Sequence, residues 1–561
     1  MKQILLSLFI ICFCQSAQAI VPGWIWAKIP HITDQGQCNS VATDPTGNIY
    51  ITGYFGSDSI TFGAFTLYNQ ASGANMFLVK YDPTGNVLWA KSGGLQNLCE
   101  ANAVTTDVDG SVYITGYYST ATCNFDNDTL RNNGLSNAFV VKYNPSGSVM
   151  WARSIGGTRQ DYGASINTDG TGNVYITGYF MSPQVVIGYD TLHSSIYYST
   201  FLTKFTTNGT PVWARQSNAT VYAIPTGVCT DNAGNIYITG SYSGSPYVVF
   251  GNDTLRINIT NVTSDVYLVK YNSAGNILWA KSFGGNYADY SSAVCTDPSG
   301  NVYVTGGFLS YKINFAGTTF MNTDSNGYSD YFLFKFSSTG NELWGRTAGG
   351  LWSEAGAGLT VDASGNIYSC GYFQSPYLYY GTDSIKNDTT SASMSLRSPD
   401  IFMFKYNPAG NLYWAKTAGG ASLDMPYGMA SDTKGNLYIG GSSNGNPFKL
   451  GSISLFCNNG SEPFLAKLNS TLETEELQIE NDPITIYPNP TKGYIVIKLN
   501  GQNYSELKIY NLMGKMVYSQ PLESNISNPQ LTMNTGQLIS GIYLVQVIGQ
   551  DGVITRQVVV E

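Results

Sequence analysis

The 561-residue chain has few charged side chains, few histidines and, beyond its N-terminus, no long hydrophobic run. Lys, Arg, Asp and Glu make up only 12% of the residues, about half the usual share, so a charge-rich disordered chain or a coiled coil is excluded. The formal net charge of −9 argues against binding to nucleic acid, because phosphates need a basic surface. No later segment is apolar over 18 residues, so no transmembrane segment is expected.

The first 19 residues have the pattern of a secretory signal peptide. Lys2 precedes an apolar run over residues 4–13, and Ala17-Gln18-Ala19 provides a small-residue cleavage site. The mature chain would therefore begin at Ile20 and be exported. Seven cysteines remain in it, and they lack the close spacing of a metal or redox motif, so most are expected to be buried small residues. A disulfide is compatible with the sequence but cannot be deduced from it.

Motifs of common enzyme classes are also missing. The only histidines are His31 and His193, which lie at non-equivalent places in the repeat described next, so neither a His-based triad nor a two-His metal motif is expected. The sequence has no nucleophile elbow, Walker loop or dinucleotide fingerprint. Hydrolase chemistry would therefore have to come from carboxylates, and we expect no enzyme.

Three sequence blocks each recur seven times, in a chain whose 61 Gly and 41 Tyr favour short strands and tight turns. A Trp followed by Ala or Gly and a basic residue lies at Trp26, Trp89, Trp151, Trp213, Trp279, Trp344 and Trp414. Asp-x-x-Gly-x-aliphatic-Tyr begins at Asp44, Asp107, Asp169, Asp231, Asp297, Asp362 and Asp432. Aromatic-x-x-Lys begins at Phe77, Phe139, Phe201, Tyr267, Phe332, Phe402 and Phe464.

Each unit is expected to contain four strands. Turns such as Asp44-Pro45-Thr46-Gly47 join them, because Pro presets φ and Gly accepts a positive φ, and a longer loop separates the second strand from the third. Such radial repetition predicts an all-β, seven-bladed β-propeller over residues 20–469. Residues 24–28 have no partner of their own and would pair with residues 464–468, which completes the last blade. The alternative is an open, solenoid-like stack, which would need distinct capping repeats.

Two segments resemble known families. Gly-Asn-Ile-Tyr-Ile-Thr-Gly at 47–53 and 234–240, with Lys-Tyr-Asp-Pro-Thr-Gly-Asn-Val-Leu-Trp-Ala-Lys at 80–91, resembles the bacterial propeller repeats called SBBP. This resemblance implies a β-propeller and little about its substrate. Residues 470–482 are a short acidic linker, and from residue 483 an alternating strand pattern predicts a small β-sandwich.

Residues 483–561 resemble the C-terminal sorting domain, type A, of the type IX secretion system of Bacteroidota. The matching segments are 486–493, 509–515 and 541–545, and they contain Tyr487, Pro488, Asn489, Pro490, Gly493, Gly514, Gly541 and Tyr543. The resemblance implies the secretion machinery and its surface protease as partners, followed by release or attachment at the outer membrane exterior. One departure from the family is that such domains often end with basic residues, whereas this one ends in Val560-Glu561.

Acidic residues precede most of the turn aspartates by seven to ten positions, and they are the first candidate site. They are Asp34, Glu100, Asp161, Asp289, Glu354 and Asp424. If the strand after each is innermost, the carboxylates converge on one mouth of the channel, where an oxygen-rich ring would suit Ca²⁺ or a cationic ligand. The alternative is that each one caps its blade-entry turn or pairs with a basic side chain.

Aromatic residues outside the repeat are the second candidate site, because binding residues concentrate in loops on a rigid scaffold. They are Tyr197, Tyr198, Trp352, Tyr377, Tyr379 and Tyr380. We therefore expect a secreted or cell-surface scaffold that binds a glycan, a peptide or a protein through its loops. An extracellular carboxylate-dependent glycosidase or lyase is the alternative, and a purely structural surface component is the third.

Overall fold

The computed structural model describes residues 22–69, 73–94, 98–194, 197–218, 222–257, 263–324, 327–388, 398–457, 460–469, 484–487, 491, 493–499, 504–511, 515–522, 530–549 and 552–560. The described residues form strands and no helix. The chain divides into two compact parts, Met1–Leu472 and Glu473–Glu561. The expected signal peptide, residues 1–19, and the acidic linker, residues 470–482, lie outside the described residues.

Seven sheets of the first part contain the same antiparallel run of four strands, named here as units 1 to 7. Unit 1 is β3 (Gly36–Thr43), β4 (Ile49–Phe55), β7 (Asn75–Tyr81) and β8 (Val87–Gly93). Unit 2 is β9 (Cys99–Thr106), β10 (Val112–Tyr118), β13 (Asn137–Tyr143) and β14 (Val149–Ile155). Unit 3 is β15 (Asp161–Thr168), β16 (Val174–Phe180), β19 (Ser199–Phe205) and β20 (Pro211–Asn218). Unit 4 is β21 (Tyr222–Thr230), β22 (Ile236–Ser243), β25 (Asp265–Tyr271) and β26 (Ile277–Phe283).

The remaining units follow the same order. Unit 5 is β27 (Asp289–Thr296), β28 (Val302–Phe308), β31 (Asp330–Phe336) and β32 (Glu342–Ala348). Unit 6 is β33 (Glu354–Val361), β34 (Ile367–Phe373), β37 (Asp400–Tyr406) and β38 (Leu412–Gly420). Unit 7 is β39 (Asp424–Ser431), β40 (Leu437–Ser443), β43 (Glu462–Leu468) and β1 (Trp24–Lys28). The fourth strand of unit 7 thus comes from the other end of the repeat region.

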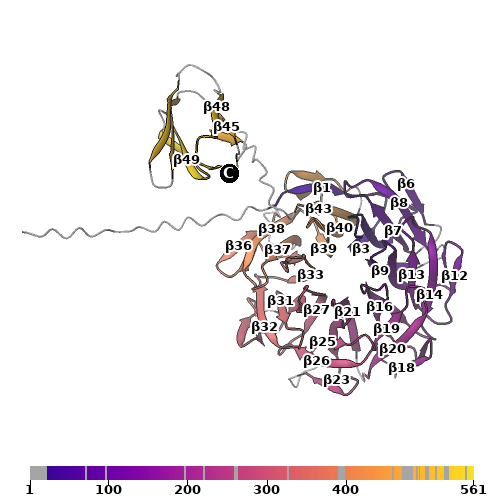
Figure 1. Ribbon diagram of the computed structural model, residues 1–561. Coiled ribbons are helices and arrows are strands. Elements are labelled where there is room, and N and C mark those ends of the chain that lie inside the picture. The colour runs from indigo at the N-terminus through magenta and orange to yellow at the C-terminus, as the bar shows by residue number, and fades with distance from the viewer. Residues whose placement is uncertain are drawn as a thin grey trace, which may run out of the picture. The chain divides into compact units, whose positions relative to one another are not determined.

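The seven units lie side by side around a common centre, with the first strand of each unit innermost (Figure 1). Each innermost strand contacts the innermost strands of the units before and after it, and β39 contacts β3. The cores lie between neighbouring units, where large apolar side chains of adjacent sheets pack together. This arrangement is a β-propeller, in which the seams between sheets carry most of the buried apolar area.

A hairpin follows the second strand of every unit, where the sequence analysis expected a longer loop. The hairpins are β5 (Ser59–Phe62) with β6 (Phe65–Tyr68), β11 (Thr122–Phe125) with β12 (Asp128–Arg131), β17 (Gln184–Ile187) with β18 (Asp190–His193), and β23 (Tyr247–Phe250) with β24 (Asp253–Arg256). The others are β29 (Lys312–Phe315) with β30 (Thr318–Met321), β35 (Tyr377–Tyr380) with β36 (Asp383–Lys386), and β41 (Phe448–Leu450) with β42 (Ile453–Leu455). Strand β2 (His31–Ile32) joins β5. Alternate hairpin residues are buried against the units, which the short runs in sequence did not reveal.

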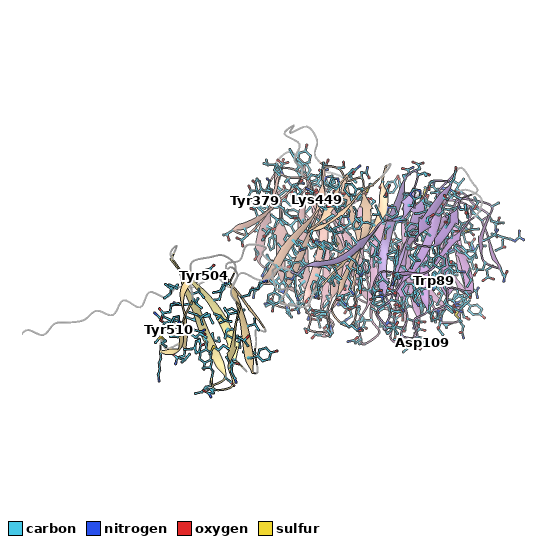
Figure 2. All side chains as sticks on the ribbon, turned by 90° about the horizontal axis from the view of Figure 1, so that it is seen from above. Trp89, Asp109, Tyr379, Lys449, Tyr504 and Tyr510 are labelled. Atoms are coloured by element: carbon cyan, nitrogen blue, oxygen red, sulfur yellow. The ribbon has the colours of Figure 1, made fainter. Side chains whose placement is uncertain are left out.

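The propeller has two different faces. The turn face holds the tight turns after the first and third strands, such as Asp44 to Gly47, where the Gly47 amide donates to the Asp44 carbonyl and Gly47 has a φ of 85°. The loop face holds the start of each innermost strand and the connections around the hairpins. Figure 2 shows the propeller edge-on, with Asp109 on the turn face and Tyr379 and Lys449 toward the opposite side.

The second part consists of two antiparallel sheets that share one core. One sheet is β44 (Ile484–Tyr487), β45 (Tyr494–Leu499) and β48 (Gln530–Asn534). The other is β47 (Met516–Pro521), β46 (Tyr504–Asn511), β49 (Gly541–Gly549) and β50 (Gly552–Val560). Ile495, Ile497, Ile509, Val545 and Val547 pack together between them, as in a β-sandwich.

The seven cysteines among the described residues are free thiols, and six of them are buried. The sulfur atoms of Cys99 and Cys123 lie 3.3 Å apart between β9 and β11. Burial raises the pKa of the Cys38 thiol to about 12 and that of Cys370 to about 12, as expected for inert, packed thiols.

Candidate functional site

The repeated polar residues form a structural network on the turn face. Asp44 Oδ1 accepts hydrogen bonds from the backbone amides of Thr46 and Asn48, at 2.9 and 3.0 Å, and Oδ2 accepts one from the Tyr50 hydroxyl at 3.1 Å. Burial opposes ionisation, but these hydrogen bonds hold the pKa of Asp44 below its usual range. Lys80 Nζ lies 3.8 Å from Asp44 Oδ2 and 5.2 Å from the centre of the Tyr50 ring. The network therefore closes this turn around an ionised Asp44.

Other units repeat these contacts and add a link to the next unit. The ion pairs Lys142–Asp107, Lys270–Asp231 and Lys335–Asp297 measure 3.5, 3.7 and 3.6 Å. The indole N–H groups of Trp26, Trp89, Trp151, Trp213, Trp279 and Trp344 donate to backbone carbonyls in the next unit's turn, at 3.0 to 3.4 Å. The recurring Trp, Tyr and Lys residues therefore serve the fold, as their regular spacing indicates.

Four of the six predicted ring carboxylates lie at the seams of the loop face. Asp161, Asp289, Glu354 and Asp424 are each the first residue of an innermost strand, and all four are fully buried. They accept hydrogen bonds from serines at or just after the end of the second strand of the same unit, namely Ser182, Ser310, Ser375 and Ser443. Burial raises the pKa of Asp289 to about 6, of Asp424 to about 7 and of Glu354 to about 8.

The other two predicted members, Asp34 and Glu100, lie elsewhere. Asp34 is exposed between β2 and β3. Glu100 is the second residue of β9, and because alternate residues of a strand point to opposite sides, its side chain faces away from the seam position that Cys99 occupies. The expected six-membered carboxylate ring is therefore not formed. Among the described residues, no three His, Cys, Asp or Glu side chains are grouped to hold a metal ion.

A second row of acids, which the sequence analysis missed, begins the third strands of units 4 to 7. These residues are Asp265, Asp330, Asp400 and Glu462, and all are buried. Burial and then the neighbouring Asp289 raise the pKa of Asp265 to about 7, and burial raises that of Asp400 to about 8, with Asp424 adding to the shift. One oxygen of Asp265 and one of Asp400 have no hydrogen-bond partner. Their common place, two residues before aromatic-x-x-Lys, is the signal that could have identified them.

These acids approach the backbone of a Gly-Gly pair. A Cβ on Gly284 would collide with Asp265 Oδ1, and a Cβ on Gly419 would collide with Asp400 Oδ1. The amide of the second glycine of the pair, Gly285, donates to Asp289 Oδ2 at 2.8 Å. The seam between units 4 and 5 thus brings two carboxyl groups, one from each unit, against glycine backbone.

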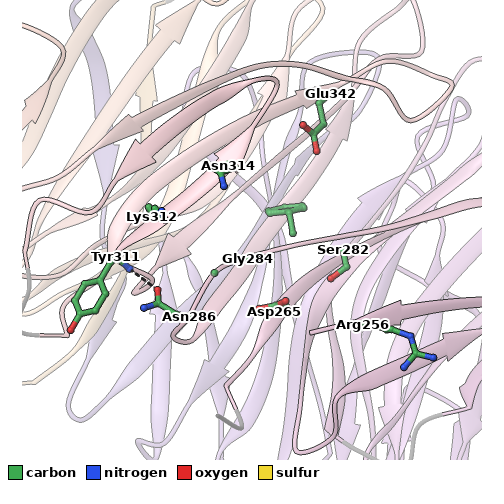
Figure 3. A pocket seen from close by; sticks show the side chains of 11 residues that line it. Arg256, Asp265, Ser282, Gly284, Asn286, Tyr311, Lys312, Asn314 and Glu342 are labelled. Carbon is green, nitrogen blue, oxygen red and sulfur yellow. Dashed lines mark hydrogen bonds between the residues drawn. The ribbon is translucent and has the colours of Figure 1, made fainter. Parts of the chain in front are cut away.

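A pocket of about 480 Å³ lies beside this seam. Figure 3 shows Tyr311 and Asn286 at one end, Arg256 at the other, and Asp265 between them. Lys312, Asn314 and Glu342 line the same pocket. Glu342 Oε2 accepts a hydrogen bond of 2.6 Å from the Ala316 amide, so this carboxylate is held in place. The pocket combines polar groups of both signs with an exposed aromatic ring.

Six tyrosines form a continuous array on the loop face of units 2 to 4, which we call the tyrosine array. The rings in contact are Tyr117–Tyr162, Tyr162–Tyr179, Tyr179–Tyr198, Tyr198–Tyr222 and Tyr197–Tyr222, with centroids 4.5, 4.9, 4.9, 5.6 and 5.4 Å apart. The Tyr198 hydroxyl donates to Gln160 Oε1 at 3.3 Å, and the Tyr117 hydroxyl hydrogen-bonds with Glu100. The structure therefore places Glu100, from one predicted set, at one end of the array and Tyr197 and Tyr198, from the other set, at its opposite end.

The remaining predicted loop aromatics do not join the array. Tyr377 and Tyr379 are exposed on β35, with ring centroids 6.3 Å apart. Tyr380 packs against Phe404, with centroids 5.1 Å apart, and belongs to the apolar core. Trp352 is half-buried at the entry to unit 6, where its amide donates to Ser375 Oγ at 2.8 Å.

Part of the predicted sorting motif lies in the second part of the chain as described. Tyr487 ends β44, Gly541 begins β49, and the Tyr543 hydroxyl donates to the Ile539 carbonyl at 2.7 Å. Gly493 is exposed just before β45. Pro488, Asn489, Pro490 and Gly514 lie outside the described residues.

Comparisons with known proteins agree with both resemblances. Residues 485–561 match the model of the secretion system C-terminal sorting domain, and residues 32–54 and 414–449 match the model of the SBBP β-propeller repeat. The chain carries propeller repeats and a secretion sorting domain. This combination indicates a secreted surface β-propeller protein that the type IX machinery handles. Within the described residues, no helix has the length and apolar character to cross a bilayer.

Two curated relatives match part of this chain. An uncharacterized WD repeat-containing protein of Acanthamoeba polyphaga mimivirus is 27% identical over 421 residues, which is 61% of this chain and 30% of the relative. The regulatory protein FlaEY of Caulobacter vibrioides is 28% identical over 184 residues, which is 30% of this chain and 19% of the relative. The matched region thus spans less than a third of either relative.

Solved structures align at lower identity. A protein of unknown function from Dyadobacter fermentans aligns at 9% identity with a TM-score of 0.36, over 80% of this chain and 100% of that chain. Sqt1 from Chaetomium thermophilum aligns at 10% identity with a TM-score of 0.32, over 80% of this chain and 100% of that chain.

Proposed function

We propose that this protein is a closed seven-bladed propeller that the type IX system exports to the cell surface, where it binds an extracellular glycan, peptide or protein. The observation that carries the proposal is the coexistence of seven like units and a C-terminal sorting domain in one chain. Residues 20–469 form the propeller, residues 470–482 the linker and residues 483–561 the sorting domain. The sorting domain is removed after export, and the propeller is the functional product.

Contacts between the two ends of the repeat region support closure. Strand β1 pairs antiparallel with β43, with Trp26 opposite Lys467 and Lys28 opposite Leu465. The Thr43 hydroxyl donates to the Ser431 carbonyl at 2.8 Å, and Lys467 Nζ donates to the Pro83 carbonyl at 3.0 Å. Removing residues 22–28 exposes the edge of β43 and should lower the melting temperature sharply. An unchanged melting temperature would contradict closure.

Export can be tested with a matched pair of chains in a bacterium that has the type IX system. The full chain should reach the cell surface and become accessible to added protease, and a chain ending at residue 472 should stay inside the outer membrane. Equal surface exposure of both chains would show that the sorting domain does not direct export. The signal peptide is present in both, so only the second translocation step differs.

Ligand binding can be tested on a glycan array and by capture of surface peptides with the full mature chain. Polar loops on a rigid scaffold support binding rather than chemistry, because the repeated carboxylates are used within the fold. Failure to bind any glycan, peptide or surface protein would favour the structural alternative.

The enzyme alternative is supported by one observation, the pocket between units 4 and 5. It contains Asp265, whose pKa burial raises to about 7, and Glu342, which breaks the repeat pattern. Two carboxyl groups in one pocket, one of them with a raised pKa, are the pairing that glycoside hydrolysis uses. Turnover of a polysaccharide by the natural chain, lost in Asp265→Asn and in Glu342→Gln, would replace the binding proposal with a glycosidase or lyase.

A further inference from the structure

The tyrosine array departs from the repeat at Tyr198 and Tyr222, although the backbone at Tyr198 does not. The residue before the third strand is Tyr198 in unit 3, whereas it is Ala74, Ser136, Ser264, Ser329, Pro399 or Ser461 in the other units. Its carbonyl accepts a hydrogen bond from the Ala223 amide at 2.9 Å, as the Ala74 carbonyl does from the Cys99 amide at 2.9 Å. The fold therefore needs only the backbone at this position, and the tyrosine ring is an addition specific to unit 3.

The array also stays accessible. Tyr117, Tyr162, Tyr179 and Tyr198 are half-buried, and Tyr222 is exposed, whereas the tyrosines of the turn network, such as Tyr50, are fully buried. The rings come from strands of three units and from one loop, so they extend along the loop face instead of filling a single core. The array is accessible and contiguous, and Tyr198 and Tyr222 have no tyrosine at the equivalent place in the other units. Such an aromatic surface marks a binding site better than it marks packing.

The chemistry of the array fits a neutral sugar chain. Tyrosine offers an apolar face for stacking and a hydroxyl that donates and accepts hydrogen bonds. Glu100, next to Tyr117, and Gln160, next to Tyr198, add acceptors at two points along the array. Sugars present apolar ring faces flanked by hydroxyl donors, which match both kinds of group. An acidic polysaccharide would bring its carboxylates toward Glu100.

We infer that the tyrosine array is the ligand site of this propeller and that it binds a neutral glycan chain laid across units 2 to 4. This inference rests on the proposed binding function and deepens it, because it names the site and the ligand class. The sugar chain would lie on the stacked rings of Tyr162 and Tyr179 and continue over Tyr198 and Tyr222 to unit 4.

The test measures binding of the full mature chain to cellohexaose, laminarihexaose and mannohexaose by calorimetry, with an acidic oligogalacturonate and a pool of surface peptides as competitors. At least one neutral hexaose should bind and should perturb the ultraviolet difference spectrum of tyrosine. Tyr198→Ala and Tyr222→Ala should each weaken that binding about tenfold or more, and Tyr198→Phe should weaken it less, because it keeps the ring. The exposed Tyr189 on hairpin β17–β18 supplies the control, and Tyr189→Ala should bind as the natural chain does.

The possible results distinguish the inferred glycan site from the broader proposal of surface display and ligand binding. If the natural chain binds no neutral hexaose, or binds only the acidic sugar or a peptide, the ligand class is wrong even where surface display is observed. If a neutral hexaose binds and both alanine variants keep full affinity with unchanged melting temperatures, the glycan site lies elsewhere. Because Tyr198 and Tyr222 lie at the loop face and not in the core, both variants should fold, and circular dichroism checks this.

Discussion

The turn face and the loop face of this propeller are built on opposite principles. On the turn face, the same Asp, Tyr and Lys recur in unit after unit, and in four units the aspartate pairs with the lysine. On the loop face, the position of Asp161 at the start of the innermost strand holds Gly36, Cys99, Ala223, Asp289, Glu354 and Asp424 in the other units. Residues that are the same in every unit therefore hold the units together. Positions that vary from unit to unit form the surface that can bind ligands.

The largest effect should come from breaking the turn network at Lys270. This side chain is nearly buried, lies 3.7 Å from Asp231 Oδ2 and donates to the Ser338 carbonyl of the next unit at 2.8 Å. Lys270→Met leaves Asp231 without its cation and should reduce the free energy of unfolding by about 3–5 kcal/mol, measured by urea denaturation. Lys281, exposed on the outer strand of the same unit, is the control, and Lys281→Met should change stability by less than about 0.5 kcal/mol.

The buried acids of the loop face should make the free energy of unfolding fall as the pH rises. Carboxylates that are ionised in the folded state have the opposite effect, because they lose stability as the pH falls. Asp265, Asp289, Asp330, Glu354, Asp400 and Asp424 have raised pKa values of about 6 to 8, chiefly through burial. The unfolded carboxyls titrate near pH 4, so between about pH 4 and pH 8 the folded state holds more protons than the unfolded state. Stability is therefore lost as the pH rises through this range, and the melting temperature should fall between pH 5 and pH 9.

Asp400→Asn tests this pH dependence at a single residue, because an amide has the shape of the protonated acid and cannot ionise. At pH 9 the variant should be more stable than the natural chain by about 2 kcal/mol, and at pH 5 the two should be similar. Unit 2 offers the reverse experiment, since Asn137 begins its third strand, as Asp400 does in unit 6, and the preceding Ser136 carbonyl accepts a hydrogen bond from the Asp161 amide. Asn137→Asp should lower stability at pH 9 and leave it nearly unchanged at pH 5. A constant difference across the pH range in both variants would contradict the buried-acid account.

The smallest effect is expected within the turn face itself, at Lys204 of unit 3. This side chain is half-buried, and its Nζ lies 3.5 Å from the Ser273 carbonyl, a weaker contact than Lys270 makes. Lys204→Met should therefore cost about 1 kcal/mol or less in urea denaturation. A loss equal to that of Lys270→Met would show that burial does not set the strength of the network.

Much of the fold could be predicted because the same turn and strand residues recur in all seven units. The turns at Asp44 and its equivalents, the Trp strand and the partner of residues 24–28 all follow from spacing and turn chemistry. The hairpins after the second strands were missed, because runs of four residues such as Ser59–Phe62 are too short to show a clear alternation.

The candidate site was harder to predict, because it depends on which side of a strand each residue faces. Glu100 and Asp161 look equivalent in sequence, but a shift of one position sends Glu100 toward Tyr117 and Asp161 into the seam. Asp265 and Asp400 were overlooked because the acids beside them, Asp289 and Asp424, come from the next unit. Tyr162, Tyr179 and Tyr222 became candidates only when the fold placed them beside Tyr198.

The most direct test of the division between the two faces is a paired measurement of melting temperature and hexaose affinity on Lys270→Met and Tyr198→Ala. The account predicts that Lys270→Met lowers the melting temperature and keeps the affinity, and that Tyr198→Ala lowers the affinity and keeps the melting temperature. The account is contradicted if either variant loses both stability and affinity. It is also contradicted if Lys270→Met loses only affinity and Tyr198→Ala loses only stability.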